Sequence, residues 1–323
     1  MPQQNNYVRN SVNPSNAGSK SCAAPLVVIG TVAIDSIETP FGKKDRVFGG
    51  SASYFSYAAS FFTPVALVAV VGKDFPEEYR QILAERSIDL SHLEAVSGKT
   101  FAWKGKYESD LNTAQTLETH LNVLLEFNPI LHFENKPEVL FLANVDPALQ
   151  AKVLDQVEKP RLKFVACDTM NYWIANKKSD LLNVLSRVDC LVLNDGEARQ
   201  LTQEPNLIRA AQKIRELGPD HVVIKKGEHG VLLFYDNHFF ALPAYPLETV
   251  FDPTGAGDTF AGGMMGYLAS TKNFSFENMK RAVAFGSMAA SFTVEDFGLE
   301  ALRRIKRQDI EDRLEIFRKL SSF

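Results

Sequence analysis

Short continuous apolar runs alternate with helix-like stretches from Leu26 onward. The runs are rich in β-branched residues and lie at 26–30, 65–72, 138–145, 163–169, 190–195 and 221–227. Continuous apolar strands with helical segments between them are typical of a parallel sheet whose two faces are covered by helices. The pattern therefore predicts an α/β fold with a doubly wound sheet. Such sheets bind ligands beyond the carboxyl ends of their strands, and here these ends carry Gly30, Asp168, Asn194 and Gly227.

Two stretches depart from this rhythm. Residues 31–48 and 100–125 alternate apolar with polar side chains, which suits exposed antiparallel strands better than crossover helices. We expect them to pair into a small β lid. Residues 1–24 are rich in Asn, Ser, Gln and Pro and have too little apolar surface to offset the entropy of ordering. We expect a disordered tail there, followed by one domain over 25–323.

Composition and charge narrow the function classes. The 323 residues carry a formal net charge of -4 and no dense run of Lys and Arg, which argues against nucleic acid or an anionic membrane surface as a partner. No apolar run approaches the roughly 20 residues that a membrane span needs. The three cysteines lack CxxC spacing and the six histidines lack an HExxH pattern. We therefore expect reduced thiols, a cytoplasmic protein and no bound transition metal.

The segment 252–263 (DPTGAGDTFAGG) is the strongest chemical signal. Its small residues let backbone amides approach an anion, and the helix-like stretch that follows adds the positive end of a helix dipole. The segment therefore predicts a phosphate site. Two other phosphate motifs fail on inspection. The dinucleotide fingerprint would need Gly where Phe260 stands, and a Walker A loop ending at 98–100 would need Gly in place of Leu93.

The segment 252–265 resembles, at every constrained position, the C-terminal signature of the ribokinase-like, or PfkB, carbohydrate kinases. The resemblance implies a ribokinase-like fold with ATP and Mg²⁺ as cofactors. In that family the Asp of GAGD removes the proton from the acceptor hydroxyl, a role that falls on Asp258. The adjacent amides, here those of Gly255, Ala256 and Gly257, form an anion hole for the transferring phosphoryl group. Positioning and charge stabilisation are most of what phosphoryl transfer asks of a protein.

The resemblance also implies an acceptor site built from the N-terminal part of the chain. Asp35 resembles the Asp that binds substrate hydroxyls in the family, and Gly49 and Gly50 resemble its Gly-Gly segment beside the acceptor. Tyr54 departs from the family pattern, which has Asn there. A phenol in place of an amide adds an aromatic face, which favours a substituted sugar or nucleoside over plain ribose. The alternative is that Tyr54 only packs in the core.

A second set of residues resembles the nucleotide side of the family's site. Asn194 and Glu197 match the family's NxxE element, which lies near Mg²⁺ and the phosphates, with Glu197 acting on the metal through water. Lys225 and Gly227 resemble its nucleotide segment, where a Lys can face the phosphates as a point charge. Lys226 is the alternative to Lys225.

Three further segments complete the implied site. The signature itself contributes Asp252 and Thr254 to the cofactor-binding set. Ser287 lies in a stretch that resembles the helix bordering the adenine. Trp103 is the aromatic residue of the lid that would cover the substrate, and Phe101 is the next choice.

The residues and the resemblance together predict an ATP-dependent kinase that transfers the γ-phosphate to a hydroxyl of a sugar or sugar-containing small molecule. A nucleoside kinase of the same fold is the alternative among enzymes, and a nucleotide-binding regulator without turnover is the alternative outside them. The presence of Asp258 favours an active enzyme. A dinucleotide-dependent oxidoreductase fits the rhythm of strands but lacks the fingerprint. The resemblance further suggests a homodimer formed through the lid.

Overall fold

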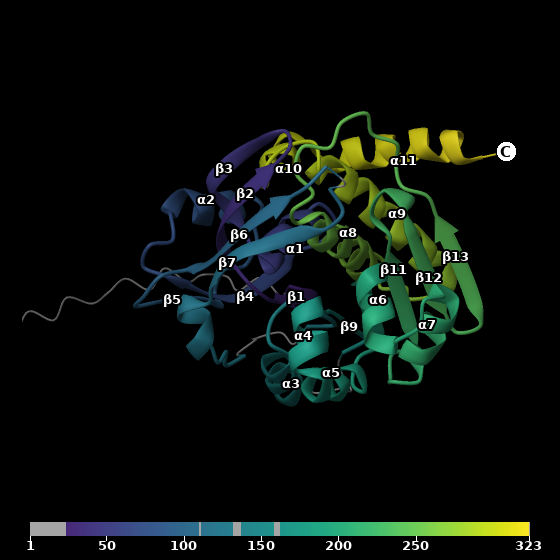
Figure 1. Ribbon diagram of the computed structural model, residues 1–323, viewed down its shortest axis with the longest axis horizontal. Helices are drawn as coiled ribbons and strands as arrows, with labels where there is room; N and C mark the ends of the chain where they lie inside the picture. The colour runs from purple at the N-terminus through teal and green to yellow at the C-terminus, as the bar shows by residue number, and fades with distance from the viewer. Residues whose placement is uncertain (1–23, 110, 132–136, 158–161, 323) are drawn as a thin grey trace, which may run out of the picture.

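The computed structural model describes residues 24–109, 111–131, 137–157 and 162–322 (Figure 1). The described residues form a large sheet with helices on both faces and a second, smaller sheet beside it, which confirms the predicted fold class. The tail predicted over 1–24 lies outside the described residues, apart from Ala24.

Nine strands of the described chain form the large sheet, in the order β13-β12-β11-β10-β9-β8-β1-β4-β5. They are β1 (Leu26–Ile29), β4 (Val65–Gly72), β5 (Leu93–Val96), β8 (Val139–Leu142), β9 (Phe164–Asp168), β10 (Cys190–Asn194), β11 (His221–Lys225), β12 (Val231–Tyr235) and β13 (His238–Leu242). Neighbours from β11 to β5 pair in parallel, and β12 and β13 add antiparallel strands at one edge. The central strands are buried on both faces, which explains their continuous apolar runs.

Two helical layers cover the large sheet, and each encloses its own hydrophobic core. One layer holds α1 (Ser51–Ala59), α2 (Glu77–Glu85), α8 (Ala256–Thr271), α9 (Phe276–Thr293), α10 (Glu300–Arg304) and α11 (Arg307–Ser321). The other holds η1 (Asn122–Glu126), α3 (Pro147–Gln156), α4 (Asn171–Asn176), α5 (Lys178–Leu185), α6 (Asp195–Thr202) and α7 (Leu207–Arg215). Successive side chains of β1, such as Val27 and Val28, enter opposite cores. Among the described helices, none has the length and apolar character needed to cross a membrane.

Four described strands form the second sheet, which we call the small sheet, in the order β3-β2-β6-β7. They are β2 (Ala33–Thr39), β3 (Gly42–Gly49), β6 (Phe101–Tyr107) and β7 (Ala114–His120). Both stretches therefore form strands as expected, but only β3 and β7 are mostly exposed, whereas β2 is largely buried. The pairs β2–β3 and β6–β7 are antiparallel, but the central pair β2–β6 is parallel, and there the expectation was wrong. A parallel pair needs a long crossover, which here runs through α1, β4, α2 and β5 of the main layers.

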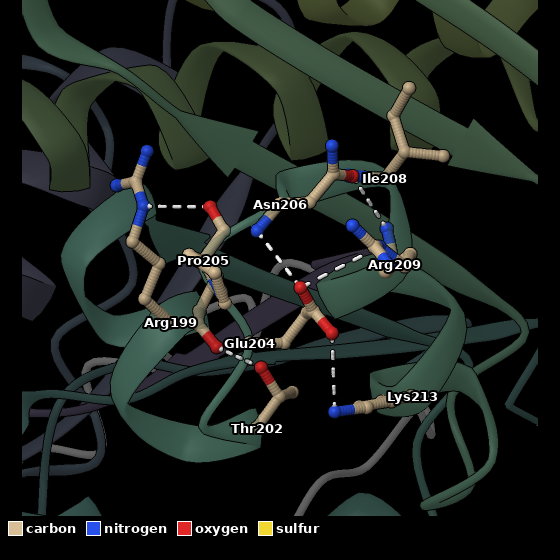
Figure 2. Close-up of polar contacts among 9 residues, drawn as sticks. Arg199, Thr202, Glu204, Pro205, Asn206, Ile208, Arg209 and Lys213 are labelled. Atoms are coloured by element: carbon tan, nitrogen blue, oxygen red, sulfur yellow. Dashed lines mark hydrogen bonds and ion pairs between the residues drawn. The ribbon is translucent and has the colours of Figure 1, made fainter.

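The turn between α6 and α7 helps to position α6, the helix that begins in the NxxE element. The side-chain oxygen of Asn206 caps α7 by accepting the backbone N–H groups of Ile208 and Arg209, at 3.0 and 3.1 Å. Glu204 accepts the N–H of Asn206 at 3.1 Å and forms ion pairs with Arg209 and Lys213 (Figure 2). These bonds tie the turn to α7, and Arg199 of α6 donates to the carbonyl oxygen of Pro205 at 3.2 Å, which joins α6 to the same turn.

Helix α8 lies in close contact with α1, and glycine makes this approach possible. A Cβ at Gly262 would lie 2.3 Å from the carbonyl oxygen of Phe55, and one at Gly266 would lie 2.8 Å from the Cα of Ala59. Both positions therefore need the absence of a side chain. Because the first turn of α8 carries Asp258, the same contact determines where the predicted base lies relative to α1.

We expect Gly266→Ala to lower the free energy of unfolding by roughly 1 to 3 kcal/mol, because the added methyl group must push α8 away from α1. Ser270→Ala, at an exposed position of the same helix, should stay within about 0.5 kcal/mol of the parent. Urea unfolding followed by circular dichroism measures both changes. Equal stability of Gly266→Ala and the parent would contradict the contact between the two helices.

Candidate active site

The turn that precedes α8 is held by the carboxylate of Asp252. One carboxylate oxygen accepts the backbone N–H of Thr254 at 2.9 Å, and the other accepts that of Gly298 at 3.4 Å. Gly255 then adopts a left-handed conformation with φ of 75°, and its carbonyl oxygen accepts the N–H of Thr259 at 2.8 Å as the helix begins. Asp252 is buried, and both of its carboxylate oxygens already accept backbone hydrogen bonds, one from Thr254 and one from Gly298. Its contact with a nucleotide therefore stays a prediction.

Tyr54 supports the same turn from its core side. Atoms of its ring lie 2.5 Å from the point where a Cβ of Gly255 would sit, so the ring and the turn are in contact. The side chain is only 1% exposed and belongs to the core beneath α1 and α8. No described residue bonds its hydroxyl group, and burial, followed by the charge of Asp252, raises its pKa well above the usual value. Tyr54 therefore has a packing role, and its contact with an acceptor stays a prediction.

Asp258 lies in the first turn of α8, close to an ammonium group. Burial raises the pKa of its carboxyl group to about 6, and the charge of Lys225 at the end of β11 limits this rise. The Nζ atom of Lys225 lies 2.8 Å from the point where a Cβ of Gly257 would sit. The structure thus brings Asp258, Lys225 and the glycine-rich turn together, with the ammonium group against the turn.

Asp168 joins this group from the end of β9, where the sequence indicated only a polar strand end. The side chain is buried, and its Oδ1 atom has no hydrogen-bond partner among the described residues. Burial, and then the charge of Asp258, raise the pKa of Asp168 well above its usual value. A buried carboxylate oxygen without a partner is costly unless a proton, ligand or cation completes it. Asp168 is therefore a candidate ligand for a cation.

The NxxE element forms a capping box at the start of α6. The side-chain oxygen of Asn194 accepts the N–H of Glu197, and Oε2 of Glu197 accepts the N–H of Asn194, both at 2.7 Å. Glu197 is buried, and burial raises the pKa of its carboxyl group while the charge of Lys225 opposes the rise. No three His, Cys, Asp or Glu side chains in the described ranges converge as a metal site made by protein alone.

Asp35 on β2 is the carboxyl group that the small sheet contributes. Burial raises its pKa to about 8 and the charge of Asp252 adds to the rise, whereas hydrogen bonds from the backbone N–H groups of Trp103 and Gly50 oppose it. A Cβ at Gly49 would lie 1.9 Å from Oδ2 of Asp35, so only glycine leaves room for the carboxyl group. Gly49, Gly50 and Trp103 therefore all lie next to Asp35. Oδ1 of Asp35 is buried and is the carboxyl oxygen left without a partner among the described residues.

Trp103 and Phe101, the two candidates for an aromatic cover, are both half-buried on β6. Trp103 pairs in register with Asp35, and its indole N–H donates to the hydroxyl of Thr116 at 3.1 Å. Phe101 lies two residues earlier and so on the same face of the small sheet. Both are placed where they can adjoin the acceptor, and their contact with it stays a prediction.

Tyr107 is a site residue that no motif in the sequence singles out. It is buried at the end of β6, and its hydroxyl accepts a hydrogen bond from the hydroxyl of Thr254 at 3.4 Å. Burial is the main cause of its raised pKa. This bond joins the small sheet directly to the glycine-rich turn. Because 147 positions separate the two residues, no local motif could reveal their contact.

Gly227 meets the small sheet on the opposite side of the site, in the 3-10 turn η3 (Gly227–His229). Its φ is 53°, and a Cβ there would lie 2.4 Å from the side-chain oxygen of Asn112, in the loop between β6 and β7. The small sheet therefore extends from Asp35 to the predicted nucleotide segment. Ser287 is half-buried on α9, and its place in a base pocket stays a prediction.

A cluster of hydrogen bonds around Asn144 is a further part of the site that no sequence motif predicted. Asn144 follows the end of β8, and its carbonyl oxygen accepts a hydrogen bond at 3.3 Å from Ser51, the residue after Gly50. Its side-chain oxygen accepts the indole N–H of Trp173 on α4 at 2.8 Å, and its amide N–H donates to the sulfur of Met170 at 3.2 Å. A half-buried tryptophan is thus tied to the strand end beside the predicted acceptor residues.

The arrangement combines a carboxyl group and backbone amides at the start of α8, an ammonium group facing them, and a second carboxyl group held by the small sheet. A carboxylate can accept a proton from a hydroxyl group, and amides with an ammonium group can stabilise a phosphoryl anion. The fold and the site together define an α/β phosphotransferase that acts on an alcohol group.

Comparison with known proteins identifies the family. A family model described as pfkB family carbohydrate kinase matches residues 25–304. A cytidine kinase from Thermococcus kodakarensis is 32% identical over 243 residues, which are 74% of this chain and 87% of that protein. The chain belongs to the PfkB family of carbohydrate kinases and is a sugar or nucleoside kinase.

Solved structures agree on the fold. A nucleoside kinase from Methanocaldococcus jannaschii superposes with a TM-score of 0.73 at 20% identity and covers 90% of this chain and 98% of its own. A ribokinase II from E. coli, in complex with ATP and Mg²⁺, gives a TM-score of 0.75 at 17% identity over 91% of this chain and 99% of its own.

We expect Tyr54→Phe to leave stability unchanged or raise it by up to about 1 to 3 kcal/mol, because it removes a buried hydroxyl group without a partner. Tyr54→Ala should lower stability by roughly 3 to 5 kcal/mol, since it removes the ring that packs beneath Gly255. Thermal and urea unfolding test both changes. A Tyr54→Phe enzyme with normal stability but a strongly raised KM for the acceptor would instead place the hydroxyl group in the acceptor site.

Proposed function

We propose that this kinase uses MgATP to phosphorylate a hydroxyl group of a nucleoside, with Asp258 as the general base. The observation that carries the proposal is the position of Asp258 at the N-terminus of α8, with a pKa of about 6 and the ammonium group of Lys225 beside it. A carboxyl group with that pKa is ionised at neutral pH and still basic enough to take up a proton during the reaction.

The protein's part in the reaction is to orient and to stabilise charge. Asp258 accepts the proton of the acceptor hydroxyl as that oxygen attacks the terminal phosphoryl group. The amides of 255–257 and the dipole of α8 stabilise the negative charge that develops, and Lys225 adds a full positive charge on the same side. Retention of this set favours an active enzyme over a regulator that only binds nucleotide.

Asp168 and Glu197 are the residues that fit Mg²⁺. Both are buried, both lie near Lys225 and Asp258, and Oδ1 of Asp168 has no protein partner in the described ranges. Hard cations prefer such carboxylate oxygens and usually keep several water ligands. Mg²⁺, when bound with ATP, would supply neutralisation of the phosphate charge. The ATP and Mg²⁺ named for the E. coli structure support this proposal.

The acceptor side favours a nucleoside over a free sugar. The unpartnered oxygen of Asp35 suits a ribose diol, whose hydroxyl groups donate hydrogen bonds. Trp173, held by Asn144, offers an indole ring on which a base can stack. The 32% identity with a cytidine kinase supports the same class of acceptor. This preference therefore rests on Trp173 and the relative, because the ring of Tyr54 is packed against Gly255.

Two further expectations concern the setting of the enzyme. The cytoplasm fits a kinase that uses ATP, and the described cysteines, Cys167 and Cys190, are free and buried.

A homodimer through the small sheet would have to bury a polar surface, because β2, β3, β6 and β7 carry exposed ion pairs such as Lys104–Glu118 and Lys106–Glu38.

We expect Asp258→Asn to lower kcat by at least about 10²-fold with little change in ATP affinity, since an amide cannot take up the proton. In the parent, kcat/KM for the acceptor should fall below about pH 6, where Asp258 becomes protonated. Lys225→Met removes the charge that lowers this pKa, so the acid limb should move to higher pH. Steady-state rates between pH 5 and 9 at saturating MgATP measure all three effects.

Asp309→Asn is the matched control, because Asp309 also lies in the first turn of a helix, α11, and is exposed. Its rate and pH profile should equal those of the parent. Near-normal turnover of Asp258→Asn would reject Asp258 as the base. An acid limb that stays in place in Lys225→Met would separate Lys225 from the titration of Asp258.

For the acceptor, we expect kcat/KM to be highest for a nucleoside in a panel of cytidine, adenosine, ribose and fructose at fixed MgATP. Trp173→Ala should lower kcat/KM for the preferred nucleoside about tenfold or more, because base stacking on an aromatic ring is worth roughly 1 to 3 kcal/mol. Trp173→Phe should retain most of the activity. Activity on ribose should change little in either variant, which also reports on correct folding.

Tyr172→Ala provides the neighbouring control, since Tyr172 is 56% exposed and contacts the ring of Trp173 edge-on. It should leave the ranking of acceptors unchanged. Ribose as the best acceptor, or an equal loss on ribose and nucleoside in Trp173→Ala, would count against the nucleoside assignment while leaving the kinase activity itself intact.

A further inference from the structure

A cavity of about 470 Å³ lies against the small sheet, and its lining includes none of the carboxyl groups assigned to the active site. Its wall is formed by all four strands of the small sheet, together with the segment after β4, the segment before β6 and the start of η1. Its lining residues are Ile34, Arg46, Asp74, Lys99, Thr100, Ala102, His120 and Asn122. A cavity of this size is large enough for a small metabolite.

The cavity and the acceptor site occupy opposite faces of the same strands. Ile34 lines the cavity and precedes Asp35, and Ala102 lines it and precedes Trp103. The pairs Ile34–Ala102 and Asp35–Trp103 are neighbouring steps of the β2–β6 ladder. Because successive side chains of a strand point to opposite faces, a ligand in the cavity would lie across the small sheet from the acceptor.

A β-bulge directs Arg46 toward this cavity. The register of β2 and β3 shifts between Asp35 and Ile37, so that β3 carries an extra residue there. Arg46, inside the bulge, has a φ of 58°, a conformation that few residues other than glycine adopt. Its carbonyl oxygen accepts a hydrogen bond from the hydroxyl of Tyr79 on α2, which holds the bulge in place. Bulges commonly re-aim a side chain in this way.

The cavity has an excess of positive charge. Neither Arg46 nor Lys99 forms an ion pair with any residue that the structure describes, and both are exposed at its rim. Asp74 is the lining carboxylate, and its Oδ1 already accepts the N–H and the hydroxyl of Thr100, at 2.7 and 2.8 Å. His120 lies within 3.2 Å of Glu118. The two basic side chains at the rim are therefore available to an anion.

The floor of the cavity is already formed. The hydroxyl of Thr100 accepts the N–H of Gly72 at 3.0 Å, and the side chain of Asn122 donates to the carbonyl oxygen of Thr100 at 2.9 Å. Asn122 also has a positive φ, of 49°. These bonds link the end of β4, the start of β6 and η1. Because the polar groups of the floor bond one another, a ligand would pay little for reorganisation on binding.

We propose that this cavity is a second ligand site, which binds a small phosphate ester. The phosphate group would lie between Arg46 and Lys99, whose guanidinium and ammonium groups form charge-assisted hydrogen bonds with phosphate oxygens. The organic part would lie over Ile34 and Ala102, which supply the apolar part of the wall. The volume of the cavity exceeds the needs of inorganic phosphate alone, which favours an ester.

The test is isothermal titration calorimetry of the full chain with CMP, ribose 5-phosphate and inorganic phosphate. A non-hydrolysable ATP analogue with Mg²⁺ is kept saturating, so that the nucleotide site does not bind the probes. We expect one of the two esters to bind more tightly than inorganic phosphate. The double variant Arg46→Ala, Lys99→Ala should weaken that binding at least about tenfold. Its kcat without ester should match the parent, which shows that it folds.

The matched control is the double variant Lys43→Ala, Lys106→Ala. It removes the same charge, here from strands β3 and β6, but Lys43 pairs with Asp45 at 3.5 Å and Lys106 with Glu38 at 3.6 Å, outside the cavity lining. Its affinity for the ester should stay within about twofold of the parent. Ester binding that survives loss of Arg46 and Lys99 would belong to the acceptor site and overturn the proposal. Inorganic phosphate that binds as tightly as both esters, or absence of binding by all three probes, would overturn it as well.

Discussion

The active site depends on the placement of several carboxyl groups near the ammonium group of Lys225. The charge of Lys225 opposes the rise in pKa of Asp168, Glu197 and Asp258, and the charge of Asp252 raises the pKa of Asp35. Like charges at short range in a partly buried site repel strongly. A triphosphate would add further negative charge. The fold must therefore either satisfy each carboxyl group internally or reserve it for a ligand, a proton or a cation.

Backbone N–H groups stabilise some of these carboxylates by donating hydrogen bonds to them. Asp252 is satisfied by two amide N–H groups of its own turn and the loop near Gly298, and Glu197 bonds the N–H that begins α6. Asp35, Asp168, Asp258 and the second carboxylate oxygen of Glu197 are left to interact with a ligand. Their environments differ, because Asp35 has a pKa of about 8 and Asp258 one of about 6. At neutral pH Asp35 is therefore mostly protonated and Asp258 mostly ionised, a division that suits Asp35 to a ligand-binding role and Asp258 to the role of base.

The fold and the centre of the site could be predicted from the sequence because their signals are local. Each buried strand is a continuous apolar run, and the turn before α8 is one uninterrupted motif. Other features depend on residues far apart in the chain. The parallel pairing of β2 with β6, the bond between Tyr107 and Thr254 and the tie between Asn144 and Trp173 arise only when the layers pack.

Tyr54 shows the limit of local reasoning in a different way. Its departure from the family pattern was visible, but the direction of its side chain was not. Helix α1 is buried on all sides, so every residue of this helix faces some part of the protein. Only the packing of α8 against α1 decides that the ring of Tyr54 meets Gly255 and that Phe55 and Ala59 meet the glycines of α8.

The contact between Gly227 and Asn112 has a consequence for how this chain can change over evolutionary time. A side chain at 227 would need the side chain of Asn112, in the loop between β6 and β7, to move aside, and the φ of 53° also disfavours residues other than glycine there. The loop belongs to the sheet that carries Asp35, whereas Gly227 belongs to the segment that follows β11. Divergence on the acceptor side is thereby coupled to divergence on the nucleotide side, and the two segments are expected to co-vary among descendants of this gene.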